Sequence, residues 1–134
     1  MLTFNALEDF LQVRPSLGLH ERRDDTVISP MRFPGTKDPV RVYVRKLEGG
    51  LFFVHDNAEA AGHVVDLDAL SASPFWAVFN RDWIDNGVSF DEERRLFTLA
   101  SGSEQLADAV ARVMEAQVVL ATLALARRSA LGAD

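Results

Sequence analysis

The stretch that decides the fold runs from Val40 to Leu70 and reads VRVYVRKLEGGLFFVHDNAEAAGHVVDLDAL. Its opening residues alternate valine with polar or aromatic side chains, a pattern that predicts a half-buried strand. Glu48-Gly49-Gly50 predicts a turn into a second strand, Leu51–Val54. His55-Asp56-Asn57-Ala58-Glu59 follows at once, at the start of a helix expected over 57–70. The polar side chains of greatest chemical interest are therefore concentrated at one strand-to-helix junction.

Toward the N-terminus, the sequence predicts one more helix and one more strand. An apolar face in residues 4–14 predicts a helix, which Pro15 ends because proline inside a helix loses a hydrogen bond. Residues 18–25 are polar and predict an exposed loop. Residues 26–33 predict a strand in which Pro30 indicates an edge position or a bulge, since proline cannot donate to a sheet.

Toward the C-terminus, the pattern predicts two helices with a hairpin between them. Ser73-Pro74 begins a helix that ends at Asn86-Gly87, and residues 88–90 and 96–99 form the hairpin. A long helix over 101–129 follows. The whole order is α-β-β-β-α-α-β-β-α, which predicts a single α+β domain over residues 1–134, with a mixed or antiparallel sheet and packed helices.

Composition narrows the classes of function. The net charge of −6 disfavours a nucleic-acid binder, which normally carries a basic patch, but it suits a basic protein partner. There is no cysteine, so disulfides and thiolate chemistry are excluded. The N-terminal residues lack the pattern of a signal peptide, and the most apolar run, 116–126, is shorter than the ~20 residues that cross a bilayer. We therefore expect a cytoplasmic protein without membrane contact.

The junction supports two hypotheses. Asp56 and Glu59 have the spacing of a capping box, in which each side chain bonds the backbone N–H of the other residue. Asp56, Glu59 and His63 could instead hold a divalent metal, because Glu59 and His63 share a helix face. The capping hypothesis is favoured because it explains both acids without a further partner, and no cofactor is expected.

The aromatic residues of the helix that begins at Ser73-Pro74 form a second candidate site. Phe75, Trp76, Phe79 and Trp83 lie on one side of this helix. A stripe of this kind packs into the core of most small domains. Two tryptophans on one short helix nevertheless exceed what a small core needs, and such residues anchor protein interfaces. The sequence therefore also predicts a partner-binding patch made of these four residues.

The last helix suggests self-association. Ser101 and Glu104 have the spacing of a capping box at its start. The segment from Gln117 to Leu125 is apolar nearly all round, and a helix of this kind is buried on every side. It must be either a central helix or one shared with a second copy, so a homodimer through this helix is one of the two expectations.

Two resemblances add to this reading. The α-β-β-β-α opening resembles the core of restriction-type nucleases, which implies an alternative metal-dependent hydrolase or nuclease using Asp38, Asp56 and Glu59. The third strand, however, carries no Glu-x-Lys, the motif that such enzymes use to bind magnesium and orient water.

Residues 20–128 also resemble an uncharacterised domain family of bacteria and their prophages. The residues that carry this second resemblance are Ser29-Pro30, Asp38 with Val40–Val44, His55–Ala60 and Asn86-Gly87-Val88. Family members have a threonine where His55 stands and a glycine where Ala58 stands. The resemblance implies a setting of mobile elements in conflict with their hosts. Together with the absence of a complete catalytic motif, it leads us to expect a small non-enzymatic protein-binding domain, an inhibitor or modulator of a host defence complex.

Overall fold

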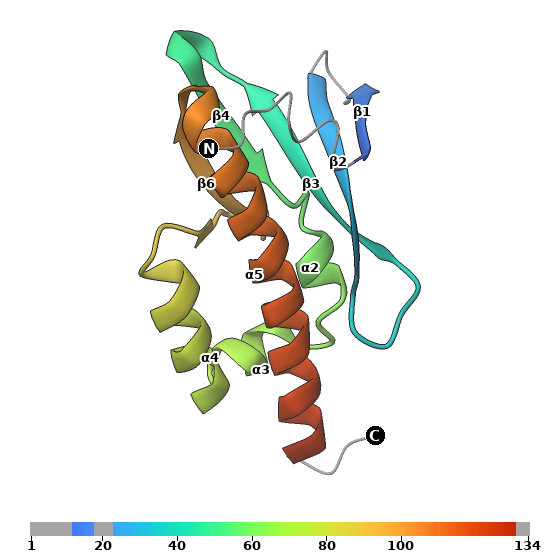
Figure 1. Ribbon diagram of the computed structural model, residues 1–134. Helices are drawn as coiled ribbons and strands as arrows, with labels where there is room; N and C mark the ends of the chain where they lie inside the picture. The colour runs from blue at the N-terminus through green and yellow to red at the C-terminus, as the bar shows by residue number, and fades with distance from the viewer. Residues whose placement is uncertain (1–11, 18–22, 131–134) are drawn as a thin grey trace.

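The structure is a computed structural model that describes residues 12–17 and 23–130 (Figure 1). It confirms the α+β class: a sheet of six strands is packed against helices, and every strand pair is antiparallel. The strands are β1 (Gln12–Leu17), β2 (Arg23–Arg32), β3 (Pro39–Lys46), β4 (Leu51–His55), β5 (Ser89–Phe90) and β6 (Leu96–Ser101). The helices are α2 (Glu59–Gly62), α3 (Leu67–Ser71), α4 (Pro74–Phe79) and α5 (Gly102–Ala130).

The strands lie in the order β1-β2-β3-β4-β6-β5. The predicted β3–β4 hairpin is present, with a turn over Glu48–Gly50 in which Gly49 has a φ of 74° that favours glycine. Tyr43 pairs with His55 across this hairpin, and Phe53 of β4 pairs with Leu99 of β6. Pro30 lies in a register shift of β2 between Ile28 and Arg32, so the pairing of β2 with β3 is interrupted around the proline, as the sequence predicts.

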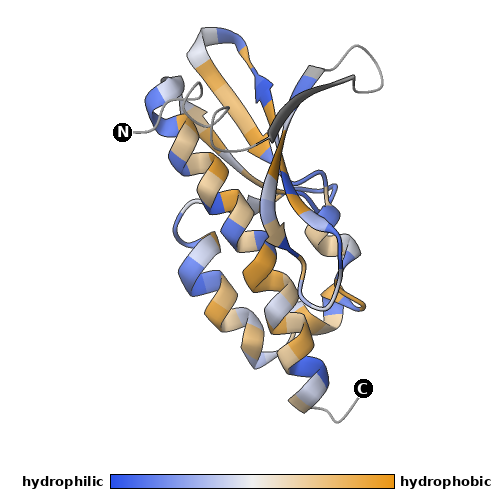
Figure 2. Cartoon of the chain, turned by 45° about the vertical axis from the view of Figure 1, so that its right-hand side comes forward, coloured by the Kyte–Doolittle hydropathy of each residue, from blue (hydrophilic) through white to orange (hydrophobic). Residues whose placement is uncertain are grey.

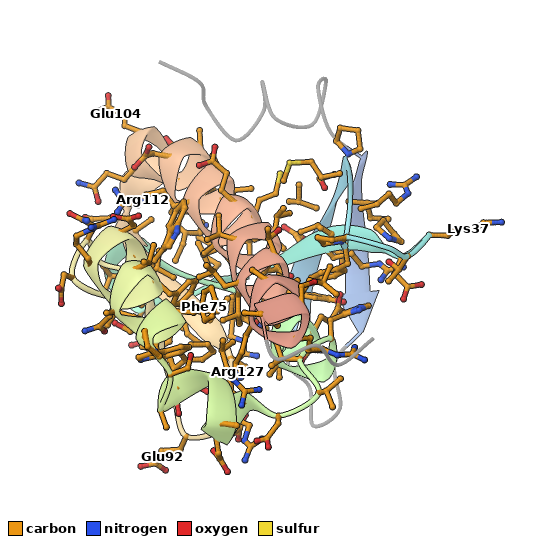
Figure 3. The ribbon with its side chains drawn as sticks, turned by 90° about the horizontal axis from the view of Figure 1, so that it is seen from below. Lys37, Phe75, Glu92, Glu104, Arg112 and Arg127 are labelled. Carbon is orange, nitrogen blue, oxygen red and sulfur yellow. The ribbon has the colours of Figure 1, made fainter. Side chains whose placement is uncertain are left out.

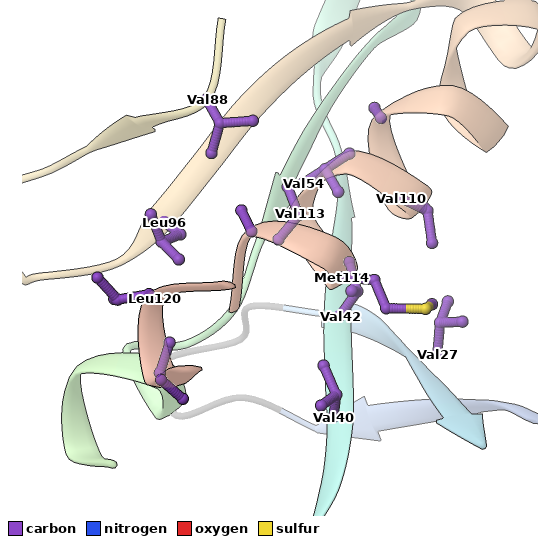
Figure 4. Close-up of a cluster of buried hydrophobic side chains, with 14 of the residues drawn as sticks. Val27, Val40, Val42, Val54, Val88, Leu96, Val110, Val113, Met114 and Leu120 are labelled. Carbon is purple, nitrogen blue, oxygen red and sulfur yellow. The ribbon is translucent and has the colours of Figure 1, made fainter. Parts of the chain in front are cut away.

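The core lies between one face of the sheet and α5, which crosses it diagonally (Figure 1). Val40, Val42 and Val44 reach this face by strict alternation along β3. Figure 4 shows Val40 and Val42 together with α5 side chains such as Val110, Val113 and Leu120, all of them buried. Burying a side chain of this size contributes about 1.5–3 kcal/mol. The alternation quoted at the outset therefore places the three valines of β3 on the face that the long helix covers.

The N-terminal predictions need correction where they can be compared. Residues 4–11 of the predicted first helix lie outside the described residues, but 12–14 belong to β1. Pro15 lies within that strand instead of ending a helix, and β1 is an edge strand, where proline is tolerated. Arg23–Asp25 extend β2 into the predicted loop because they pair with Pro15–Leu17 of β1. The local sequence pattern could not predict β1, because this strand depends on its pairing with β2.

The single helix predicted over 57–70 is wrong. The chain forms α2 and α3 instead, separated at His63–Asp66. Val64 and Val65 are β-branched and favour helix weakly, and the Asp66 side chain accepts the N–H of Ala69 to begin α3. The helix predicted over 73–86 also changes character, because α4 continues into a π-helical turn over Asn80–Ile84. It ends before Gly87, whose φ of 99° fits the predicted left-handed cap.

Helix α5 is the longest element of the described chain. Its start is capped by Gln105, whose side chain accepts the Ser101 N–H, so the predicted pairing of Ser101 with Glu104 is wrong. By length and composition alone it could cross a membrane, and 44% of its most apolar window is buried in the structure. Figure 2 shows apolar residues along most of its length. Leu125 of α5 is exposed and available for contact with a second copy, so the homodimer through this helix stays a prediction.

Candidate functional site

Asp56 organises the strand-to-helix junction from inside. Its carboxylate is completely buried and accepts three backbone N–H groups, from Ala58 at 2.9 Å, Ala60 at 3.0 Å and Leu96 at 2.9 Å. Burial raises the pKa of Asp56 to about 6, although the three amides favour its charged form. The bond to Leu96 joins the junction to β6, 40 positions further along the chain. Asp56 is therefore a structural acceptor with no oxygen presented to solvent.

The backbone beside Asp56 is strained. Asn57 and Ala58 both have left-handed conformations, with φ values of 54° and 60°. This region costs a residue with a Cβ about 1 kcal/mol or more, and alanine has no side-chain polar group to compensate. The cost is offset by the bonds to Asp56 and by the His55 Nδ1, which accepts the Asn57 N–H at 3.0 Å. The predicted capping box is consequently absent, since Ala58 occupies the N-cap position of α2.

His55 is held in one orientation by contacts on all sides. Its ring is 1% exposed and stacks between Tyr43 and Phe53. Since Nδ1 accepts a bond, Nε2 carries the proton and donates to Asp24 at 3.1 Å. Burial lowers the pKa of His55 below its ordinary value, and the Asp24 carboxylate opposes this only in part. Arg45 completes the group with a 2.8 Å ion pair to Asp24.

Glu59 faces away from Asp56, toward β3. It accepts a short hydrogen bond from the Tyr43 hydroxyl and lies 3.6 Å from an Arg41 guanidinium nitrogen. Burial and the neighbouring Glu59 carboxylate raise the pKa of Tyr43, so its hydroxyl stays protonated at neutral pH. The cluster joins α2 to the middle of the sheet. Tyr43, Glu59 and Arg41 bond to one another, so a structural role that holds α2 against the sheet accounts for this cluster.

His63 forms a separate small group with the β2–β3 connection. Its ring stacks on Phe33, with centroids 3.9 Å apart, and its Nε2 lies 3.7 Å from the Asp38 carboxylate. Asp38, Glu59 and His63 line an open pocket of about 450 Å³ together with Arg41. The tertiary structure therefore brings these three predicted residues to one concavity, whereas Asp56 lies buried beneath the junction.

The alternative catalytic and metal hypotheses are not supported by this geometry. Within residues 12–17 and 23–130, no group of three or more His, Asp or Glu side chains is placed to hold a metal ion. The three side chains of the predicted metal set do not converge on one ion. The Asp56 oxygens accept backbone N–H groups, Glu59 bonds to Tyr43, and His63 faces Asp38. Of the predicted catalytic set, Asp38 and Glu59 line the pocket, with the Asp38 side chain 66% exposed, whereas Asp56 is buried and bonded to backbone amides.

The predicted aromatic patch is largely part of the core. Phe79 is fully buried, and Phe75, Trp76 and Trp83 are half-buried against the core cluster. Trp76 packs on both Phe79 and Phe90, with ring centroids 5.2 and 5.6 Å away. Figure 3 shows Phe75 between the helices, in contrast to Lys37, which projects from the β2–β3 loop. The arrangement favours the core interpretation of this stripe over a set of four surface anchors.

The structure reveals a surface that sequence reasoning missed. The side of the sheet opposite the core, here called the outer face, carries an apolar strip formed by Leu51, Phe53, Phe97 and Leu99. Leu99 is 56% exposed and Leu51 38% exposed, while the two phenylalanines are half-buried. Both strands are apolar at nearly every position, LFFVH in β4 and LFTLAS in β6, so the period of 2 that marks a half-buried strand is absent from them. Which of the two faces α5 would cover was the information that the sequence lacked.

Arginine side chains border this strip and are held in place. The guanidinium groups of Arg45 and Arg95 lie 5.5 and 5.1 Å from the centre of the Phe53 ring. Arg95 is fixed by ion pairs to Asp91 at 2.6 Å and to Glu93 at 3.2 Å, as Arg45 is by Asp24. Burial raises the pKa of Asp91, but bonds from Arg95 outweigh this and hold it below its ordinary value. These ion pairs therefore hold both guanidinium groups beside the Phe53 ring of the strip.

Comparisons with known proteins add no relative. No family model matches the chain, and no curated protein or solved structure matches it at a significant level.

Proposed function

We propose that this protein is a non-enzymatic binding module that docks another protein on the outer face of β4 and β6. The observation that carries the proposal is the exposed apolar strip of Leu51, Phe53, Phe97 and Leu99. Exposed aliphatic side chains beside aromatic rings bury favourably against a partner, at about 25 cal/mol for each Å² of apolar surface removed from water.

The border of the strip supports the same function. Aromatic residues and arginine are enriched at protein interfaces, and both are present here in fixed positions. Because Arg45 and Arg95 are already ordered by ion pairs, binding costs little of their side-chain entropy. The strip is a preformed surface, which suits rigid docking better than a fold-on-binding mechanism.

The biological setting proposed for this module rests on the prophage-like resemblance. In that setting the partner is a component of a host defence complex in the cytoplasm, and the module acts as its inhibitor. The acidic net charge of −6 favours a basic partner surface, since complementary charge speeds encounter. A homodimer through α5 is a separate proposal, which light scattering of the purified protein would decide.

Affinity capture from a lysate of the source cells tests the function. Wild type is compared with Leu99→Asp, which places a charge in the strip, and with Val65→Asp, a matched control at a 79% exposed valine away from the sheet. We expect wild type and the Val65 variant to retain one stoichiometric protein that the Leu99 variant loses. Equal capture by all three folded proteins would place the contact elsewhere and contradict the proposal.

A further inference from the structure

The edge of β6 is covered over only part of its length. β5 pairs with β6 at two positions, Ser89 with Phe97 and Phe90 with Leu96. Beyond them, Thr98–Ser101 pairs with β4 on one side, and no described strand lies on the other. A strand edge of this kind presents backbone groups that only another extended chain can pair regularly.

Backbone N–H and carbonyl groups point to alternate sides along β6, and this alternation shows which of them are available at the open edge. The Leu96 carbonyl accepts the Asp56 N–H, so Leu96, Thr98 and Ala100 direct their backbone groups toward β4. The N–H and carbonyl of Leu99 consequently point to the open edge. At the next outward position the Ser101 N–H is already bonded to Gln105 at 2.9 Å. Leu99 is therefore the centre of the open segment.

A polar recess adjoins this segment on the side of α5. It has a volume of about 270 Å³, and its lining residues are Asn86, Thr98, Leu99, Gln105, Asp108, Ala109 and Arg112. Arg112 is engaged, because it donates a short hydrogen bond to the Asn86 carbonyl. Asp108 is exposed and makes no ion pair or hydrogen bond with any residue in the described part of the chain. Figure 3 shows Arg112 on the same side of the molecule as Glu104, which, like Asp108, is an acidic residue of α5.

We propose that the open edge of β6 accepts an extended segment of the partner protein as an added strand, with a basic–apolar–basic pattern. The residue opposite Leu99 shares its face and extends the apolar strip beside Phe97. Its two neighbours face the opposite way, into the recess, where Asp108 favours lysine or arginine. This inference rests on the proposed function and specifies how the same surface is used.

A second copy of this chain does not fit the edge symmetrically. A two-fold axis at Leu99 would set residue 101 of the second copy opposite Phe97, where Ser89 already pairs. The free edge is too short for two identical strands to face each other. Its geometry therefore selects a short extended segment from a different chain.

A peptide titration monitored by NMR tests the inference without a lysate. The probe is acetyl-Lys-Val-Lys-amide, whose three residues span only the positions opposite Thr98, Leu99 and Ala100. It is added at millimolar concentration to isotope-labelled protein. We expect saturable shifts at Thr98–Ser101 and Asp108. N-methylation of the central valine removes one backbone donor and should weaken binding about fivefold, as for the loss of one hydrogen bond. Replacing both lysines with glutamate should abolish binding, and Asp108→Asn should weaken binding of the lysine probe.

Two outcomes would overturn the added strand. One is the absence of saturable shifts; the other is equal binding of the N-methylated peptide. Leu99→Pro gives an independent measurement, because it removes the outward N–H and leaves the ladder to β4 intact. A lysate partner lost by Leu99→Asp but kept by Leu99→Pro would preserve the proposed function and overturn strand addition. If Leu99→Pro does not fold, the N-methylated peptide decides.

Discussion

The strand-to-helix junction and the open edge of β6 use their polar groups in opposite ways. At the junction, Asp56 and His55 direct their hydrogen-bonding atoms inward, onto backbone amides and Asp24. At the edge, the backbone of Leu99 and the carboxylate of Asp108 have no partner among the described residues. The junction is conspicuous in the sequence and serves the fold. The edge is inconspicuous and offers the groups that a partner needs.

The largest expected effect comes from Asp56→Ala. It leaves three buried N–H groups without an acceptor, at about 1–3 kcal/mol each, so the free energy of unfolding should fall by at least about 3 kcal/mol. Asp66→Ala is the matched control, since Asp66 accepts one exposed N–H and should cost about 1 kcal/mol. Urea denaturation measures both, and similar small losses would mean that Asp56 is not the organiser of the junction.

Trp76→Ala should destabilise the protein by about 2 kcal/mol, less than for a fully buried tryptophan because the ring is half-exposed. Val78→Ala, at an exposed position on the same helix, is the control and should have little effect. The partner-binding hypothesis for this helix predicts a different result. Thermal denaturation of Trp76→Ala would then match wild type, while capture of the lysate protein would be lost.

His55 should make the protein less stable in mild acid. Burial depresses its pKa in the folded state, so the unfolded chain binds more protons once the pH falls below about 6.5. Its contribution is thus complete above pH 6.5 and declines as the pH falls. Asp56 acts in the opposite direction between about pH 6 and 4, because its pKa is raised in the folded state.

His55→Gln isolates the histidine contribution to this pH dependence. The free energy of unfolding should fall less between pH 7.5 and pH 5 in the variant than in wild type, whatever the difference in their absolute stabilities. Urea titrations at several pH values give the two slopes. Parallel slopes would show that His55 takes up a proton equally well in the folded and unfolded states.

The smallest expected effect is that of divalent metal. Because the described residues bring no three suitable side chains together, millimolar manganese or magnesium should leave the melting temperature unchanged. Glu59→Gln serves as the control, since it should be equally insensitive. A rise in wild type that the Glu59 variant lacks would revive the hydrolase hypothesis at the pocket of Asp38 and His63.

The sequence by itself determined the α+β class, the β3–β4 hairpin, the interrupted pairing at Pro30 and the long final helix. These features follow from local causes: alternating valines, a glycine turn, a missing donor and a continuous apolar run. It also singled out Asp56, Glu59 and His63 as residues with unusual surroundings. Three of the candidates, Asp38, Glu59 and His63, do share a pocket.

Only the tertiary structure decided what those residues do and which surface stays open. Asp56 is fixed by Leu96, and His55 by Asp24, so their roles depend on strands distant in the chain. β1 exists because β2 pairs with it, which no local propensity encodes. The open edge at Leu99 results from the shortness of β5. Pairing and burial are collective properties of the folded chain, and local patterns record only one side of each contact.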